Sequence, residues 1–223
     1  PTKPFPYGGS VLIMGATGIV GREVVEQLLL AGERVRVAVR SPSKVMHLRT
    51  RGVEVTELDF ARTSTVENAF KGVDRLFLLT PFDNRMVQFT EQLVLEAQRV
   101  GVKHIVKLSA MGADTKSSLV AGRWHGEAEK LVAESGIPCT ILRPNMFMQN
   151  IVTFFADSIC SEGKFYVPAG EGKVTFIDAR DIARVAVLAL TKRGYSDKIY
   201  TITGSEALSF SDVAKKLSMG LGQ

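Results

Sequence analysis

Three glycines that follow a short apolar run constrain the fold of this chain more than any other feature. Residues 11–14 are Val-Leu-Ile-Met, and Gly15, Gly18 and Gly21 follow, ahead of a segment whose apolar residues recur with helical periodicity. A buried strand that turns through glycines into a helix presents backbone N–H groups to a pyrophosphate. Gly15 is expected to permit the turn, Gly18 to let phosphates approach, and Gly21 to let the helix pack closely. The spacing predicts an α/β protein with a dinucleotide site, rather than a purely structural turn.

The next strand, expected over residues 34–40, predicts which dinucleotide is preferred. An NAD site places a carboxylate about 20 residues after the glycines, where it accepts a hydrogen bond from the ribose 2′-hydroxyl. Here Arg40 occupies that place, followed by Ser41 and Lys44. Two cations and a hydroxyl would hold a 2′-phosphate, whereas a carboxylate would repel it. The position predicts NADP(H) in preference to NAD(H), and a solvated basic loop is the alternative.

Composition narrows the class of protein and its partners. A chain of 223 residues is long enough for one α/β domain with a sizeable core. No apolar stretch reaches the roughly 18 residues of a membrane span, and residues 1–10 are interpreted as a loose leader rather than a signal peptide. Cys139 and Cys160 form no metal-binding pattern and fit a reducing cytoplasm. The net charge of +5 is scattered along the chain, so neither nucleic acid nor membrane is expected as a partner.

Strands and helices alternate along the chain, which predicts a doubly wound parallel sheet of the Rossmann type in a single domain over residues 1–223. Residues 1–146 are expected to form the dinucleotide-binding core, and residues 147–223 mainly a small substrate-side lobe. Ser64 and Glu67 predict a capping box at the start of a helix over 64–70. The other expected helices cover 43–51, 84–100, 124–135, 147–158, 178–190 and 209–219, and the later strands 53–58, 75–79, 104–108, 139–142, 165–167, 174–177 and 198–202.

Several segments together resemble a known family. They are Gly15-Ala-Thr-Gly-Ile-Val-Gly21, Val39-Arg-Ser-Pro-Ser-Lys44, the strand before Asp59, and residues 101–109 and 135–145. Over nearly the whole chain they resemble the NmrA-like, atypical branch of the short-chain dehydrogenase/reductases. That family includes NAD(P)H-dependent quinone, azo-dye and triphenylmethane-dye reductases, and proteins that bind NAD(P) without known turnover and act as redox-sensing regulators. Relatives usually continue further, so this chain is expected to be trimmed or to have an unusually open pocket.

The resemblance assigns cofactor contacts to residues at the carboxyl ends of the strands. The glycine loop with Thr17, Ile19 and Val20 would hold the pyrophosphate, and Asp59 and Phe60 would flank the adenine. The residues implied to lie near the adenosine, the nicotinamide ribose and the nicotinamide are Leu79, Thr80, Pro81, Phe82, Pro144, Asn145 and Phe147. Ordinary packing is the alternative for Leu79 and Pro144.

The catalytic residues are where the chain departs from better-known members of that superfamily. Those proteins use a serine and a Tyr-x-x-x-Lys pair, in which the lysine lowers the pKa of the tyrosine. Ser109 occupies the serine position, but no tyrosine lies between residues 8 and 165. The corresponding pair is His125 and Glu129, as in the quinone- and dye-reductase branch. His125 is expected to position substrate or donate a proton near neutral pH, or else to make a contact without chemistry. A structural contact is equally expected of Lys107.

These features predict an NADPH-dependent oxidoreductase that passes hydride to a planar, electron-poor small molecule such as a quinone or a dye. A monomer or homodimer without a metal site is expected. Phe82 and Trp124 would stack on a flat acceptor or simply fill the lobe. The leading alternative is an NADP(H)-binding redox sensor without turnover, which the missing tyrosine favours equally. An epimerase or ether reductase of the same fold is a more distant possibility.

Overall fold

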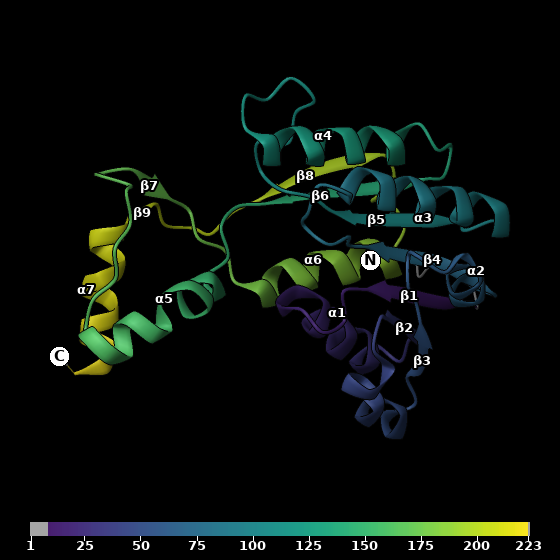
Figure 1. Cartoon of the computed structure of the whole chain (residues 1–223), viewed down its shortest axis with the longest axis horizontal. Coiled ribbons are helices and arrows are strands. Elements are labelled where there is room, and N and C mark those ends of the chain that lie inside the picture. The colour runs from purple at the N-terminus through teal and green to yellow at the C-terminus, as the bar shows by residue number, and fades with distance from the viewer. Residues whose placement is uncertain (1–8, 223) are drawn as a thin grey trace.

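A parallel sheet of seven strands organises the protein (Figure 1). The computed structural model describes residues 9–222. The strand order is β3-β2-β1-β4-β5-β6-β8, and every neighbouring pair is parallel. The strands are β1 (Ser10–Met14), β2 (Val35–Val39), β3 (Glu54–Glu57), β4 (Val73–Leu78), β5 (His104–Leu108), β6 (Cys139–Pro144) and β8 (Lys198–Ile202). The order reverses between β1 and β4, where a doubly wound sheet opens a crevice at the carboxyl ends of its strands. The predicted fold class is confirmed.

Helices cover both faces of this sheet, so its central strands are buried and mostly apolar, with polar exceptions that include His104 and Lys107 on β5. Every residue of β1 and β5 is buried, as expected for strands that pack against helices on both sides. One face carries α1 (Ile19–Leu30) and α6 (Ala179–Thr191), and the other carries α2 (Thr63–Phe70), α3 (Met86–Val100) and α4 (Val120–Ala133). A short helical segment, η1 (Pro42–Arg51), follows β2.

A smaller lobe stands beyond the carboxyl ends of the strands, at the left of Figure 1. It contains α5 (Gln149–Glu162), the short antiparallel pair β7 (Lys173–Val174) and β9 (Leu208–Ser209), and α7 (Phe210–Leu221). A cluster around Ile151, Phe176 and Val213 forms its core. In sequence, α6 and β8 lie between these elements, but both belong to the main sheet layer. The expected boundary after residue 146 therefore does not separate core from lobe, because the chain returns to the sheet in between.

Three local expectations are wrong. Residues 165–167 form no strand, and Ser10 is buried in β1 rather than part of a loose leader, whose residues 1–8 lie outside the described part. The capping box of Ser64 and Glu67 is absent, because α2 begins at Thr63 and no side chain caps it. The capping box that the structure does contain joins Ser209 to Asp212 at the start of α7.

Within residues 9–222, no helix is long and apolar enough to cross a lipid bilayer. In the same range, no group of three or more acidic, histidine or cysteine side chains is placed to hold a metal ion. Both cysteines are free, with Cys139 buried and Cys160 exposed.

Candidate functional site

The glycine loop between β1 and α1 leaves the start of the helix open. Gly15 has a φ of +70°, and a Cβ at this position would lie 2.5 Å from Cδ2 of Leu79, so only glycine fits the turn. The N–H of Gly18 donates to the carbonyl of Gly15 at 2.9 Å. No side chain caps α1, and its first turn holds no acidic residue. The first N–H groups of the helix are therefore available to an anion.

A cavity of about 730 Å³ lies beside this loop, at the carboxyl ends of β4, β5 and β6. It brings together predicted residues from five separate stretches of sequence. The predicted residues that line it are Gly18, Ile19, Val20, Leu79, Thr80, Phe82, Ser109, His125, Pro144, Asn145 and Phe147. Other lining residues were not among the predicted contacts: Met86, Lys107, Leu108, Ala110, Met111, Met146 and Asn150. The remaining predicted residues lie outside its lining: Gly15, Thr17, Arg40, Ser41, Lys44, Asp59, Phe60 and Pro81.

One buried hydroxyl in the cavity has no partner. The Oγ1 atom of Thr80 is buried, and no hydrogen bond to it is found among residues 9–222. A buried polar group without a partner costs free energy, and a ligand that brings its own donor or acceptor would remove that cost. Together with the open start of α1, this hydroxyl fits a polar, phosphate-bearing ligand that runs from the glycine loop into the cavity.

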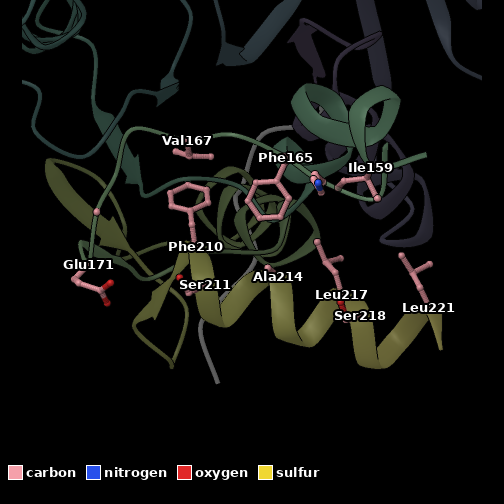
Figure 2. Close-up of a pocket in the computed structure, with 13 residues that line it drawn as sticks. Ile159, Phe165, Val167, Glu171, Phe210, Ser211, Ala214, Leu217, Ser218 and Leu221 are labelled. Atoms are coloured by element: carbon pink, nitrogen blue, oxygen red, sulfur yellow. The ribbon is translucent and has the colours of Figure 1, made fainter. Parts of the chain in front are cut away.

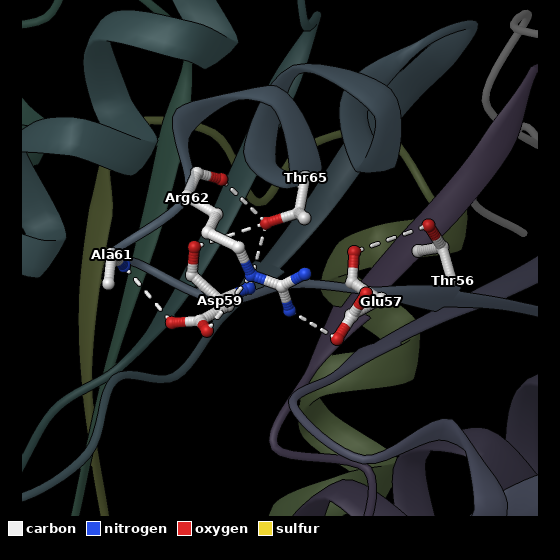
Figure 3. Close-up of polar contacts among 6 residues, drawn as sticks. All are labelled: Thr56, Glu57, Asp59, Ala61, Arg62 and Thr65. Atoms are coloured by element: carbon white, nitrogen blue, oxygen red, sulfur yellow. Dashed lines mark hydrogen bonds and ion pairs between the residues drawn. The ribbon is translucent and has the colours of Figure 1, made fainter.

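The basic residues after β2 are free to meet an anion. Arg40 and Lys44 are exposed, and neither side chain forms a hydrogen bond or ion pair with the described residues. Asp59 is engaged instead, since it accepts hydrogen bonds from the N–H of Ala61 at 3.0 Å and from Nε of Arg62 at 3.2 Å (Figure 3). The bond from Ala61, the guanidinium of Arg62 and, to a smaller extent, the charge of Arg40 hold the pKa of Asp59 below its usual value. The carboxylate at this end is thus neutralised within the protein.

Further side-chain contacts hold the loop between β3 and α2. The hydroxyl of Thr65 accepts a hydrogen bond from the N–H of Asp59 at 2.9 Å and donates one to the carbonyl of Arg62 at 2.7 Å (Figure 3). Arg62 also pairs with Glu57. Beside it, the ring of Phe60 stacks on that of Phe89, with 3.9 Å between the centroids.

Ser109, His125 and Glu129 meet at one wall of the cavity. The hydroxyl of Ser109 donates to Oε1 of Glu129 at 2.5 Å, and Nδ1 of His125 lies 3.4 Å from the same hydroxyl. Arg143, at the end of β6, holds the Glu129 carboxylate through Nε at 2.9 Å and Nη2 at 2.5 Å. Bidentate pairing of this kind adds geometric specificity and fixes the position of the carboxylate. The predicted serine and histidine are therefore neighbours, and an unpredicted arginine anchors them.

The hydrogens of this cluster follow from its donors and acceptors. A carboxylate only accepts, so the single hydrogen of the Ser109 hydroxyl goes to Glu129. The Ser109 oxygen can then only accept from His125, which requires the hydrogen of the neutral imidazole to be on Nδ1. Nε2 of His125 consequently carries a lone pair and acts as an acceptor.

Burial and a neighbouring charge keep His125 neutral. Desolvation, assisted by the positive charge of Lys107, lowers the pKa of His125 to about 4. An imidazole with this pKa holds no extra proton to give between pH 6 and 8. This environment disfavours proton donation by His125 near neutral pH. Its role in the site stays a prediction, and it does lie beside Ser109 in the cavity.

The aromatic ring of Phe82 lines the mouth of the cavity, and Trp124 packs against it from outside the lining. Phe82 is 65% exposed, and its ring lies edge-on to Trp124 at 5.8 Å and stacks on His125 at 6.0 Å between centroids. The side chain of Asn145, which also lines the cavity, already has a partner within the protein, because its Nδ2 donates to Oγ1 of Thr175 at 2.7 Å. The mouth thus presents a flat apolar face, and Asn145 stabilises the loop after β6.

A second cavity, of about 440 Å³, lies within the lobe and holds none of the predicted residues. In Figure 2 the ring of Phe165 lies next to that of Phe210, which begins α7, and Leu217 and Leu221 continue the apolar lining along that helix. Several residues that line this cavity, among them Phe165, Phe210 and Leu217, also pack against the small hydrophobic core of the lobe.

Comparison with known proteins shows which family the chain belongs to. The model of the NmrA-like family matches residues 8–223. The chain belongs to the NmrA-like family. An NAD(P)H azoreductase of Xenophilus azovorans is 42% identical over 213 residues, which cover 96% of this chain and 74% of that protein.

Two solved structures are similar to this NmrA-like protein. The triphenylmethane reductase of Citrobacter sp., complexed with NADP(H), has a TM-score of 0.83 and 27% identity, over 94% of this chain and 75% of that one. The NADPH-dependent quinone oxidoreductase of Escherichia coli, complexed with NADPH, has a TM-score of 0.86 and 28% identity, over 96% of this chain and 76% of that one.

Proposed function

We propose that this protein is an NADPH-dependent oxidoreductase that delivers hydride to a planar, electron-poor small molecule, such as a quinone or a dye. One observation carries the proposal: a single cavity joins the open glycine loop to the exposed ring of Phe82 and to the Ser109–His125 pair. The azoreductase, quinone reductase and dye reductase among its relatives support an NAD(P)H-dependent oxidoreductase.

Different residues of the site would bind different parts of the cofactor and the acceptor. The first N–H groups of α1 would bind the pyrophosphate, with Arg40, Ser41 and Lys44 at the 2′-phosphate. Thr80 would contact the part of the cofactor that enters the cavity, where the reduced nicotinamide supplies a hydride. Phe82 and Trp124 would orient a flat acceptor against that ring, since aromatic faces favour offset stacking. A conjugated acceptor delocalises the charge it gains, so a tyrosine acid is not essential.

The direct test is consumption of NADPH in the presence of a panel of quinones, azo dyes and nitro compounds. Turnover of a member of the panel supports the proposed function. Tight NADPH binding without turnover across the panel would instead favour a redox sensor, which the missing tyrosine also permits. In that case the oxidised and reduced cofactor must differ in affinity for two states of the protein, because a ligand shifts an equilibrium only by its differential affinity.

Cofactor choice is expected to depend on Arg40. NADPH should bind at least about tenfold more tightly than NADH, or roughly 1.4 kcal/mol. Arg40→Asp should reverse this order, because the new carboxylate repels the 2′-phosphate and can accept from a 2′-hydroxyl. Titration calorimetry with both cofactors measures the two affinities.

Arg193→Asp is the matched control, because it changes the net charge equally at an exposed residue between α6 and β8. The control should keep the wild-type preference. Equal affinities of the wild-type protein for NADPH and NADH would contradict the proposed site of the 2′-phosphate.

Loss of His125 is expected to weaken turnover without changing its pH profile. His125→Ala should lower kcat/KM by about ten- to a hundredfold, since it removes a positioning contact and a wall of the cavity. Because His125 is neutral above its pKa of about 4, the dependence on pH between 6 and 8 should be the same in the variant. His47→Ala, at an exposed histidine on η1, is the control. A pH dependence that disappears in His125→Ala would show that this residue titrates near neutrality after all.

A further inference from the structure

A buried lysine lines the cavity without a carboxylate bound to it. Lys107, on β5, is 1% exposed. Its Nζ donates to the carbonyl of Leu108 at 3.1 Å, and this is its only hydrogen bond within residues 9–222. Two further N–H bonds of the ammonium remain for a ligand. Because the Leu108 carbonyl ends β5, Nζ is held at the edge of the sheet where the cavity opens.

Packing does not account for this lysine. Burying an ammonium group is strongly unfavourable unless a partner compensates for the lost hydration. The charge that could compensate, Glu129, is already held by two nitrogens of Arg143 and by the hydroxyl of Ser109. A cation kept in such a place is a candidate for function rather than stability.

We propose that Lys107, rather than His125, donates the proton that a reduced acceptor takes up. The inference rests on the proposed function, since it requires a hydride acceptor in the cavity. The contacts of His125 disfavour it as the donor, because a hydrogen on Nδ1 would point at Ser109 and leave Nε2 as an acceptor.

The step balances in atoms and charge. The acceptor gains two electrons and one hydrogen as hydride, which leaves a negative charge on its oxygen or nitrogen. An Nζ–H bond of Lys107 breaks as the new O–H or N–H bond forms, and Lys107 becomes a neutral amine. After the product leaves, the amine regains a proton from water. The reduced nicotinamide would supply the hydride and so lose the two electrons that the acceptor gains.

The surroundings of Lys107 lower its pKa enough for the ammonium to give up a proton near neutral pH. Burial lowers the pKa of Lys107 to about 8, and the charge of Glu129 opposes that shift. The other groups of the cluster are His125 on α4, which is neutral, and Arg143 on β6, which forms an ion pair with Glu129. Lys107 is therefore mostly charged at pH 7 and loses its proton as the pH rises through about 8, so a rate that needs this proton should fall there.

Kinetics of three lysine variants test the donor. Lys107→Met should lower kcat/KM at pH 7 by about a hundredfold, within the usual range for a general acid, and should remove the fall in rate near pH 8. Lys107→Arg should be similarly slow, since its guanidinium stays charged but does not release a proton. Lys130→Met, at an exposed lysine on α4 that pairs with Glu134, should behave as wild type. Thermal unfolding should show that Lys107→Met is folded, because methionine replaces a buried charge with a side chain of similar length.

A second readout requires neither turnover nor cofactor. 4-Nitrophenol carries the hydroxyl of a reduced quinone, and its phenolate has its own visible absorption band. At pH 6 the wild-type protein and Lys130→Met should bind it as the phenolate, held by the Lys107 ammonium. Lys107→Met should bind it more weakly and as the neutral phenol.

The outcomes separate this inference from the function on which it rests. A wild-type protein that reduces no acceptor would overturn the proposed function and the proton step together. An active protein in which Lys107→Met or Lys107→Arg keeps the wild-type rate and pH profile would overturn the role of Lys107 alone. Binding of 4-nitrophenol as the phenolate to Lys107→Met would likewise exclude contact between Lys107 and the hydroxyl of the ligand.

Discussion

Replacing Gly18 with valine is expected to abolish dinucleotide binding while the fold persists. Gly18 is exposed at the start of α1, and a Cβ there would meet only the carbonyl of Gly15, at 3.3 Å. The protein itself can accept this contact with a small shift. A phosphate cannot, because the branched side chain would occupy the space through which it approaches the helix N–H groups. Affinity for NADPH should fall by about 4 kcal/mol, or roughly a thousandfold.

Calorimetry and thermal unfolding measure the two halves of this prediction. The matched control is Gly172→Val in the lobe, where a Cβ would also meet one carbonyl, that of Ala169 at 3.0 Å. The control should bind NADPH as the wild type does. If Gly18→Val still binds NADPH tightly, the nucleotide does not lie on this loop. Turnover of a quinone or dye that disappears in Gly18→Val would rule out a purely sensory role.

The sheet could be predicted from the sequence because its signals are local. The strands over residues 104–108 and 198–202 have the bounds expected for them, since each is short and ends at a polar turn. Helix α4 begins at Val120, four residues before the expected start. Ser117, Ser118 and Gly122 indicate a loop by composition, but Arg123 donates to the carbonyls of Ser117 and Ser118. Such contacts override the local helix propensity of these residues, so the start of the helix cannot be predicted from propensity alone.

The cavity was predictable in outline, and its acid–base chemistry was not. Residues at the carboxyl ends of parallel strands must meet at one edge, which is why Thr80, Ser109 and Asn145 line one cavity. The pairing of Glu129 with Arg143 joins a helix to a strand 14 residues away, and no spacing rule predicts it. That pairing decides which way the hydrogens of Ser109 and His125 point. It also leaves Lys107 as the buried cation without a carboxylate bound to it. Roles that depend on such contacts require coordinates.

The same loop contains a glycine whose role is packing. A Cβ on Gly21 would lie 2.1 Å from the carbonyl oxygen of Gly15 and 2.6 Å from its carbon. These are backbone atoms that cannot rotate aside, so α1 would have to move away from the turn that follows β1. Gly21→Ala is therefore expected to lower the free energy of unfolding by about 3 kcal/mol, the upper end of the usual cost of overpacking. Urea unfolding followed by circular dichroism measures the change.

Gly220→Ala makes the same substitution in a helix where the added methyl group has room. Gly220 lies in α7, and a Cβ there would have no heavy atom within 4 Å. Alanine should stabilise this site by about 0.5–1 kcal/mol, because it restricts the unfolded chain and favours the helix. One substitution thus has opposite expected signs at two helical glycines, and the sign depends only on the distance to the nearest backbone. If Gly21→Ala unfolded at the same urea concentration as the wild type, the close approach of α1 to the Gly15 carbonyl would be wrong. The conclusion that Gly18 serves phosphate binding whereas Gly21 serves helix packing would then also be wrong.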